Sequence, residues 1–174
     1  MKTIFLVGYM GCGKSSLGRA LAEQLGCEFI DLDQYIEQQE KTTIPSLFET
    51  RGEKAFRLLE RQAIIDLAGR QNVVVATGGG AACYSDNMTL MNGAGITIYL
   101  KVEPEELWRR LSQPEAQASR PLISALSREA LREKIASMLS LREPYYLQAQ
   151  LIVPCDNAPK EESLQKILHS LQKK

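Results

Sequence analysis

The sequence predicts an α/β domain in which a five-stranded parallel sheet is covered by helices on both faces. Three observations lead to this class. Short runs of β-branched and aromatic residues recur along the chain, amphipathic helical patterns separate them, and 174 residues are enough for one domain. Strands that alternate with helices in this way form parallel sheets with right-handed crossovers. No repeat or linker divides the sequence, so residues 1–174 are expected to form a single domain.

The strands and several helix ends can be placed in order. The expected strands are TIFLV, EFID, NVVVA, GITIYL and QLIVP, at residues 3–7, 28–31, 72–76, 95–100 and 150–154. Gly26 follows the pattern SLGRALAEQL as a helix stop. Pro104 stands in the first turn of EPEELWRRL, and Ser127 can cap the long helical pattern after it. These signals predict helices between the strands.

Composition excludes several classes of protein. The 21 basic and 21 acidic residues cancel, so the overall charge favours neither a nucleic-acid nor a membrane partner. The four cysteines lie far apart, and with a single histidine they offer no zinc-ligand spacing, so a reducing cytoplasm is the expected location. No apolar segment approaches the length of a membrane span. The opening MKTIFLVGYM is expected to be a buried first strand, because no cleavage site of a secretion signal follows it.

The stretch GYMGCGKSS, at residues 8–16, has the spacing G-x-x-x-x-G-K-S between an expected strand and an expected helix. This is the context of a phosphate-binding loop, in which glycines let backbone N–H groups surround a phosphate. Lys14 can reach the β- and γ-phosphates, the Ser15 hydroxyl can join the ligands of Mg²⁺, and Ser16 is expected near the α-phosphate. The sequence therefore predicts a nucleotide site, although the loop alone does not identify the acceptor.

Two aspartates follow the second expected strand. The sequence lacks the N-K-x-D motif that reads guanine, so ATP is the expected donor. In an extended stretch Asp31 and Asp33 point to the same side, so one can anchor Mg²⁺ through water while the other accepts a hydroxyl proton. The run DLD also fits a simple cap of the next helix.

Three further features could bind an anionic acceptor. Arg57 and Glu60 have an i, i+3 spacing at which Glu60 can hold the guanidinium, although such pairs are commonly surface ion pairs. The run TGGG after the third strand can bring backbone close to a substrate, or can be a turn that needs positive φ. Arg120 and Arg142 could each be ordinary surface charges. Residues 112–126, which contain two prolines, are typical of a mobile surface segment and are a candidate lid.

Taken in order, the motifs G-x-x-G-x-G-K-S, DLD, IPSLFETRGEKAFRLLE, TGGG, RPL and LREPYY resemble the shikimate kinase family from about residue 4 to residue 159. The resemblance implies a P-loop NTPase-like three-layer sandwich with strand order 2-3-1-4-5, a substrate-binding segment at about residues 32–62 and a mobile lid. It implies transfer of the γ-phosphoryl group of ATP to the 3-hydroxyl of shikimate, with Mg²⁺, in aromatic amino acid biosynthesis. A monomer with no nucleic-acid or membrane partner is expected.

The resemblance also implies a role for individual residues. Nucleotide contacts would come from the phosphate-binding loop, the helix before the lid, the lid and the segment after the last strand, through Gly11, Cys12, Gly13, Lys14, Ser15, Ser16, Arg110, Arg120 and Pro159. Arg110 would stack on adenine, Arg120 would swing in to neutralise the transferred phosphoryl group, and Ser15 with Asp31 would serve the metal. Shikimate would contact Asp33, Phe48, Phe56, Arg57, Gly79, Gly80 and Arg142. Within this set Asp33 would be the candidate base, and Arg57 and Arg142 would clamp the carboxylate.

Two alternatives stay open on the sequence. One is a P-loop kinase of another small metabolite, such as gluconate or a nucleoside monophosphate. The other is a switch module that binds ATP without a small acceptor, and such a module would not need Asp33, Arg57 and Arg142 in one pocket. Shikimate-dependent release of ADP distinguishes these possibilities.

Overall fold

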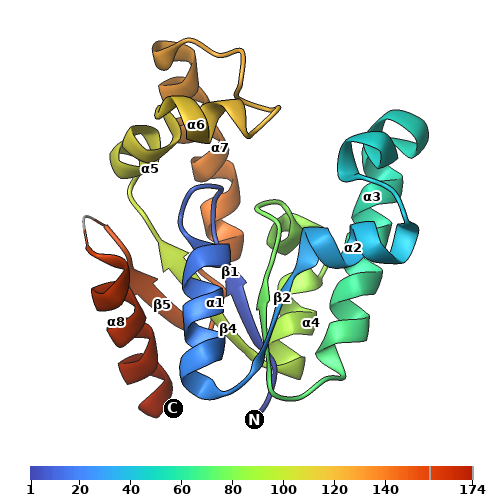
Figure 1. The fold of residues 1–174 in the computed structure, drawn as a ribbon, viewed down its shortest axis with the longest axis vertical. Helices are drawn as coiled ribbons and strands as arrows, with labels where there is room; N and C mark the ends of the chain where they lie inside the picture. Colours follow the sequence, from blue (N-terminus) through green and yellow to red (C-terminus); the bar gives the residue numbers. More distant parts are fainter. Residues whose placement is uncertain (157, 174) are drawn as a thin grey trace.

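Five parallel strands form one sheet in the order β2-β3-β1-β4-β5 in the computed structural model, which describes residues 1–156 and 158–173 (Figure 1). The strands are β1 (Ile4–Val7), β2 (Glu28–Asp31), β3 (Val73–Ala76), β4 (Ile96–Lys101) and β5 (Leu151–Pro154). Leu6 of the central strand aligns with Ala76 on one side and Ile98 on the other. The expected strands and the expected order are confirmed, with boundaries that agree to within one residue.

Helices cover both faces of this sheet. They are α1 (Lys14–Leu25), α2 (Leu32–Glu40), α3 (Ile44–Ala68), α4 (Asn87–Ala94), α5 (Pro104–Leu111), α6 (Pro114–Ala118), α7 (Arg128–Tyr146) and α8 (Lys160–Gln172), with a short 3₁₀ turn η1 (Ala81–Cys83). Helices α1 and α8 pack together, as do α3 and α4 (Figure 1). The three-layer arrangement is therefore as expected, and no helix in the described part of the chain has the length and apolar character needed to cross a membrane.

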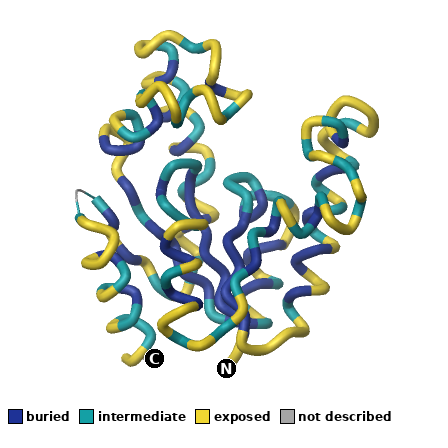
Figure 2. Tube along the Cα trace, in the orientation of Figure 1, coloured by how far each residue is buried: buried dark blue, intermediate teal, exposed yellow. Residues whose placement is uncertain are grey.

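The core lies along the central strand β1 and its neighbours β3 and β4. All four residues of β1 are buried, and so are all four of β3 (Figure 2). A sheet covered on both faces buries both sides of its strands, which is why these strands are continuous apolar runs without alternation. Gly18 lets α1 approach this core closely, because a Cβ atom there would stand 2.6 Å from the ring of Phe29. The helix that follows the glycine-rich loop is thus fixed against the sheet.

The predicted helix ends are confirmed. Gly26 ends α1 with φ 63°, a left-handed conformation that suits glycine. The side chain of Ser127 accepts a hydrogen bond from the backbone N–H of Ala130 at the start of α7. Pro104 is the first residue of α5.

Two segments extend beyond the carboxyl ends of the strands, on either side of the β1–α1 loop (Figure 1). One contains α5, α6 and residues up to 126, and the other contains α2 and the first part of α3. Helix α3 is broken at Gly52, whose φ of 77° and ψ of 171° are not helical. In the candidate lid, Gln117 donates hydrogen bonds to the carbonyl oxygens of Ile123 and Leu126, and the Ile123 side chain is buried. The lid segment thus has internal contacts, and its mobility stays a prediction.

Candidate active site

The β1–α1 loop turns on three glycines with positive φ. Gly8, Gly11 and Gly13 have φ values of 142°, 81° and 99°. A Cβ atom at Gly8 would also lie 2.9 Å from the sulfur of Cys12. Helix α1 begins at Lys14, so its free N–H groups and positive dipole end are at this loop. The local geometry is that of an anion-binding loop.

Lys14 and Ser15 form hydrogen bonds with residues at the carboxyl end of the sheet. The ammonium of Lys14 donates to the carbonyl oxygens of Gly8 and Tyr9, at 2.7 and 2.9 Å. The hydroxyl of Ser15 donates to Oδ2 of Asp31 at 2.8 Å. A serine hydroxyl and a carboxylate are the hard oxygen ligands that Mg²⁺ prefers, so this pair fits the metal that the sequence implies.

Asp31 and Asp33 were expected on one extended stretch, but they do not lie on one. Asp31 ends β2 and caps α2, where its Oδ1 accepts from the N–H groups of Asp33 and Gln34. Asp33 is already in the first turn of α2. The extended geometry was wrong because the cap starts the helix one residue after Asp31. The capping alternative is therefore correct, and it coexists with the Ser15 contact because the two carboxylate oxygens have different partners.

A cavity of about 440 Å³ opens beside the loop, between α1, α5 and α8. Its walls include five of the predicted nucleotide residues, namely Cys12, Gly13, Ser16, Arg110 and Pro159. Glu106, Arg109 and Cys155 also line it and were missed from the sequence. Burial raises the pKa of the Cys155 thiol to about 11, so this thiol is protonated at neutral pH.

A second cavity, of about 550 Å³, is lined by both arginines that were predicted to bind the acceptor. It is lined by Glu53, Lys54, Arg57, Gly80, Cys83, Tyr84 and Arg142. Arg57 Nη1 lies 2.7 Å from Oε2 of Glu60, whose side chain is only 1% exposed. Burial raises the pKa of Glu60, against the opposing effect of the Arg57 charge. Because the carboxylate is buried, the pair is not a surface ion pair, and it fixes one nitrogen of Arg57 at the cavity wall.

The triple glycine makes room for this ion pair. A Cβ atom at Gly80 would stand 2.6 Å from Nη2 of Arg57, and one at Gly78 would stand 2.8 Å from Oε1 of Glu60. None of the glycines at 78–80 has positive φ. Gly79 and Gly80 do lie in a turn, but the positive φ of the turn alternative is contradicted, and the Arg57–Glu60 pair occupies the space that side chains at 78 and 80 would take.

Arg142 reaches the same cavity from α7. Its guanidinium carbon lies 5.7 Å from the ring centre of Tyr9, and its Nη1 would be 3.5 Å from a Cβ atom at Gly79. The hydroxyl of Tyr146, on the next turn of α7, donates to the carbonyl oxygen of Gly79 at 2.5 Å. Tyr146 is fully buried against Tyr99, with ring centres 5.2 Å apart. Tyr146, the last residue of the motif LREPYY, thus connects α7 to the glycine segment, a contact that was not predicted.

Asp33 lies between the phosphate-binding loop and the Arg57–Glu60 pair. A Cβ atom at Gly78 would lie 3.1 Å from Oδ1 of Asp33 and 2.8 Å from Glu60, so both carboxylates approach the same glycine. Burial and then the charge of Asp31 raise the pKa of Asp33, while the charges of Lys14 and Arg57 lower it. Asp33 is therefore within electrostatic range of both the loop lysine and the acceptor arginine.

Nine of the predicted residues line neither cavity, and they are Gly11, Lys14, Ser15, Asp31, Asp33, Phe48, Phe56, Gly79 and Arg120. The rings of Phe48 and Phe56 pack against each other with centres 4.7 Å apart, and Phe56 is buried while Phe48 is 38% exposed. Nη1 of Arg120 donates to Ala116 and Ser119 in its own segment, at 2.5 and 3.1 Å. The contribution of Arg120 to a reaction would thus require a movement of the lid, and this stays a prediction.

The strand order and the glycine loop define the class of protein, a P-loop NTPase-like fold, in which one cavity is lined by loop residues and a second by Arg57 and Arg142. The model of the family described as shikimate kinase matches residues 10–172. A shikimate kinase of Parabacteroides distasonis is 42% identical over 99% of each chain. The chain therefore belongs to the shikimate kinase family.

Solved structures agree with this assignment. The shikimate kinase of Bacteroides thetaiotaomicron is 43% identical and superposes with a TM-score of 0.91 over 98% of each chain. The shikimate kinase of Acinetobacter baumannii in complex with shikimate is 35% identical, with a TM-score of 0.87 over 99% of this chain and 94% of the other. A gluconokinase of Sinorhizobium meliloti is 20% identical with a TM-score of 0.61, a likeness that shows the fold alone.

Proposed function

We propose that this chain transfers the γ-phosphoryl group of ATP to the 3-hydroxyl of shikimate, giving shikimate 3-phosphate and ADP. The observation that carries the proposal is the cavity that both Arg57 and Arg142 line, with Arg142 5.7 Å from the ring centre of Tyr9 in the phosphate-binding loop. Two guanidinium groups suit a carboxylate, which a gluconate or shikimate acceptor carries and a pure nucleotide switch does not need. Family membership favours shikimate between these two acids.

On the nucleotide side, the loop and the start of α1 would hold the phosphates. The N–H groups from Gly11 to Ser16 surround the anion, and Lys14 exchanges its two carbonyl partners for phosphate oxygens. Ser15 and Asp31 would hold Mg²⁺, which when bound neutralises charge on the β- and γ-phosphates. The base would occupy the cavity that Arg110 and Pro159 line.

On the acceptor side, the arginines would position the ring. Arg57 and Arg142 bind the carboxylate, and backbone atoms of Gly79 and Gly80 contact hydroxyl groups. Asp33 binds the acceptor hydroxyl and takes its proton as the new P–O bond forms, while the bond from the γ-phosphorus to the β–γ bridging oxygen breaks and ADP leaves. Phe48 and Phe56 flank the ring from the segment before and after Gly52. Arg120, brought in by lid closure, would complete the charge neutralisation.

The deciding experiment is ADP release measured with and without shikimate in the presence of MgATP. We expect release that depends on shikimate and yields shikimate 3-phosphate. Gluconate and AMP should serve as matched acceptors that give no comparable rate. An equal rate of ADP release with gluconate would indicate a kinase of another metabolite. A rate that is the same with and without any acceptor would indicate a switch module.

Asp33→Asn is expected to slow phosphoryl transfer by about 10² or more, because the amide cannot accept the hydroxyl proton. Single-turnover measurements with the enzyme in excess isolate this step from product release. Asp66→Asn, on the exposed face of α3 where Asp66 bonds Gln62, is the matched control. A normal single-turnover rate for Asp33→Asn would remove Asp33 from the reaction.

Gly80→Ala is expected to raise the KM for shikimate about tenfold with little change in the KM for ATP. The new methyl group would stand 2.6 to 2.9 Å from the guanidinium of Arg57 and must push it away from its place beside Glu60. The control is Gly93→Ala in α4, where a Cβ atom meets nothing within 4 Å. An unchanged shikimate KM in Gly80→Ala would mean that the Arg57 position does not set acceptor binding.

A cytoplasmic location is also part of the proposal. It is supported by the four cysteines, all of which are free thiols.

A further inference from the structure

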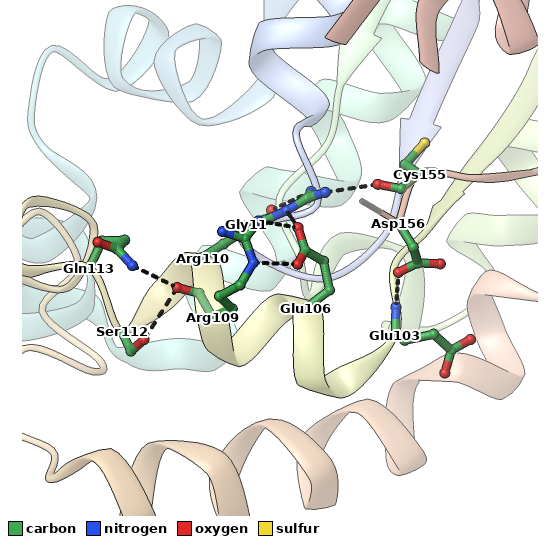
Figure 3. Close-up of polar contacts among 9 residues, drawn as sticks. All are labelled: Gly11, Glu103, Glu106, Arg109, Arg110, Ser112, Gln113, Cys155 and Asp156. Carbon is green, nitrogen blue, oxygen red and sulfur yellow. Dashed lines mark hydrogen bonds and ion pairs between the residues drawn. The ribbon is translucent and has the colours of Figure 1, made fainter. Parts of the chain in front are cut away.

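A buried carboxylate lies at the edge of the nucleotide cavity, between two consecutive arginines of α5 (Figure 3). The Glu106 side chain is 6% exposed. Its two oxygens accept from Nε and Nη2 of Arg109, at 2.7 and 2.8 Å, and its Oε1 also accepts from Nε of Arg110 at 2.7 Å. Each carboxylate oxygen therefore has a charged donor.

Arg110 is bonded through all three of its nitrogens. Besides the Glu106 contact, its Nη2 donates to the carbonyl oxygen of Cys155 at 2.8 Å and its Nη1 to that of Gly11 at 3.4 Å (Figure 3). These partners come from α5, from the loop after β5 and from the phosphate-binding loop. A second contact joins the same regions, because the N–H of Glu103 donates to Oδ1 of Asp156 at 2.6 Å.

A guanidinium donates its hydrogen bonds in its own plane. Bonds at all three nitrogens therefore fix the plane of Arg110 and with it the direction of its flat face, while three of its five N–H donors are used by protein acceptors. A flat cation of this kind suits a planar purine ring by stacking. Of the three partners, Glu106 is the one that is a charged side chain, so it makes the strongest of the bonds.

We propose that Glu106 is a positioning residue for nucleotide recognition, which holds the guanidinium of Arg110 in the plane that the base of the nucleotide stacks on. The proposal deepens the proposed function and rests on it only in assigning this cavity to the base. The hydrogen bond from Arg109 lowers the pKa of Glu106 to about 2. Burial acts in the opposite direction, and the bond from Arg110 lowers the pKa further. The carboxylate is thus ionised throughout the range in which a kinase is assayed.

The test compares a ligand that has a base with one that lacks it. In Glu106→Gln, one amide oxygen replaces two carboxylate oxygens, so the bond to Arg110 is weakened or lost. We expect the Kd for ADP, measured by calorimetry without shikimate, to rise about tenfold, since a stacked cation contributes roughly 1 to 2 kcal/mol. The Kd for pyrophosphate should stay within about twofold. Equal weakening of both ligands would mean a general disturbance of the loop and would overturn the proposal.

The neighbouring Glu105 is the matched control. It is 61% exposed on the same helix and pairs with Arg132 at 2.7 Å. Glu105→Gln should leave both dissociation constants unchanged. A double-mutant cycle with Arg110→Ala adds a measurement that a merely structural residue would not affect. The ADP affinity of the double variant should equal that of Arg110→Ala alone, whereas additive losses would contradict positioning through Arg110.

A measurement on the unaltered protein covers the case in which Glu106→Gln does not fold. The Nε–H of Arg110, assigned in NMR spectra by comparison with Arg110→Lys, should exchange with water at least about tenfold more slowly than that of the exposed Arg132. Equal exchange would overturn the proposal. Because these binding and exchange measurements use no acceptor, they stay informative even if shikimate-dependent turnover is absent, so the two proposals can fail separately.

Discussion

Arg120→Ala is expected to lower kcat by about 10³, the effect of removing an arginine that neutralises a transferring phosphoryl group. In the structure its guanidinium bonds only to Ala116 and Ser119 among the described residues. It therefore contributes nothing to ground-state nucleotide binding in this arrangement, and the Kd for ADP should change by less than about twofold. The separation of kcat from Kd is what identifies an interaction made in the transition state.

The control for this prediction is Arg128→Ala. Arg128 starts α7 next to the lid, and its guanidinium lies 4.9 Å from the ring centre of Trp108. Its loss removes a positive charge from the same region without touching the reaction. A kcat loss in Arg120→Ala no larger than in Arg128→Ala would show that lid closure does not bring Arg120 to the phosphoryl group.

Arg57→Lys is expected to raise the KM for shikimate by about 10- to 100-fold. The charge-assisted hydrogen bonds that the substitution weakens contribute roughly 1.5 to 3 kcal/mol each. A lysine ammonium cannot bond Glu60 and a ligand carboxylate with the planar fork of a guanidinium. Steady-state kinetics with ATP at saturation give the shikimate KM directly, and the KM for ATP should hardly change.

Two controls distinguish binding from folding in this variant. Arg51→Lys changes an arginine of the same helix that is 52% exposed and pairs with Glu40. Thermal unfolding reports whether the buried Glu60 carboxylate has lost its partner, because an unpaired buried charge is costly to the fold. A shikimate KM within about twofold of the wild-type value, in a folded Arg57→Lys enzyme, would exclude Arg57 from the acceptor site.

Much of the fold could be predicted because its signals are local. Strands such as IFLV and VVVA are apolar along their whole length, and the helices between them end at residues with a clear stop or cap, as Gly26 and Ser127 show. The phosphate-binding loop was predictable for the same reason, since its glycines, lysine and serine are contiguous in the sequence. The arginines at 57 and 142 share a cavity, as the motif order implied.

The rest of the site depends on contacts between residues far apart in the chain. The role of Gly80 is visible only when Arg57, from another element, occupies the space that a side chain would fill. Tyr146 and Gly79 are joined by a hydrogen bond across 67 positions of the sequence. The geometry of Asp31 and Asp33 was mispredicted because a strand end and a helix cap coincide at Asp31, and the DLD pattern fits either conformation.

The break at Gly52 has a consequence for the electrostatics of the cavity that Arg57 and Arg142 line, the proposed acceptor site. The left-handed φ of Gly52 divides α3 into two helical runs, and the second run starts at Glu53 and Lys54, which line that cavity. An uninterrupted helix would have no terminus there, whereas this one presents the positive end of a macrodipole beside the two arginines. A residue with a side chain at position 52 would favour one continuous helix, and the partial positive charge of the second helix start would be lost from the proposed carboxylate site.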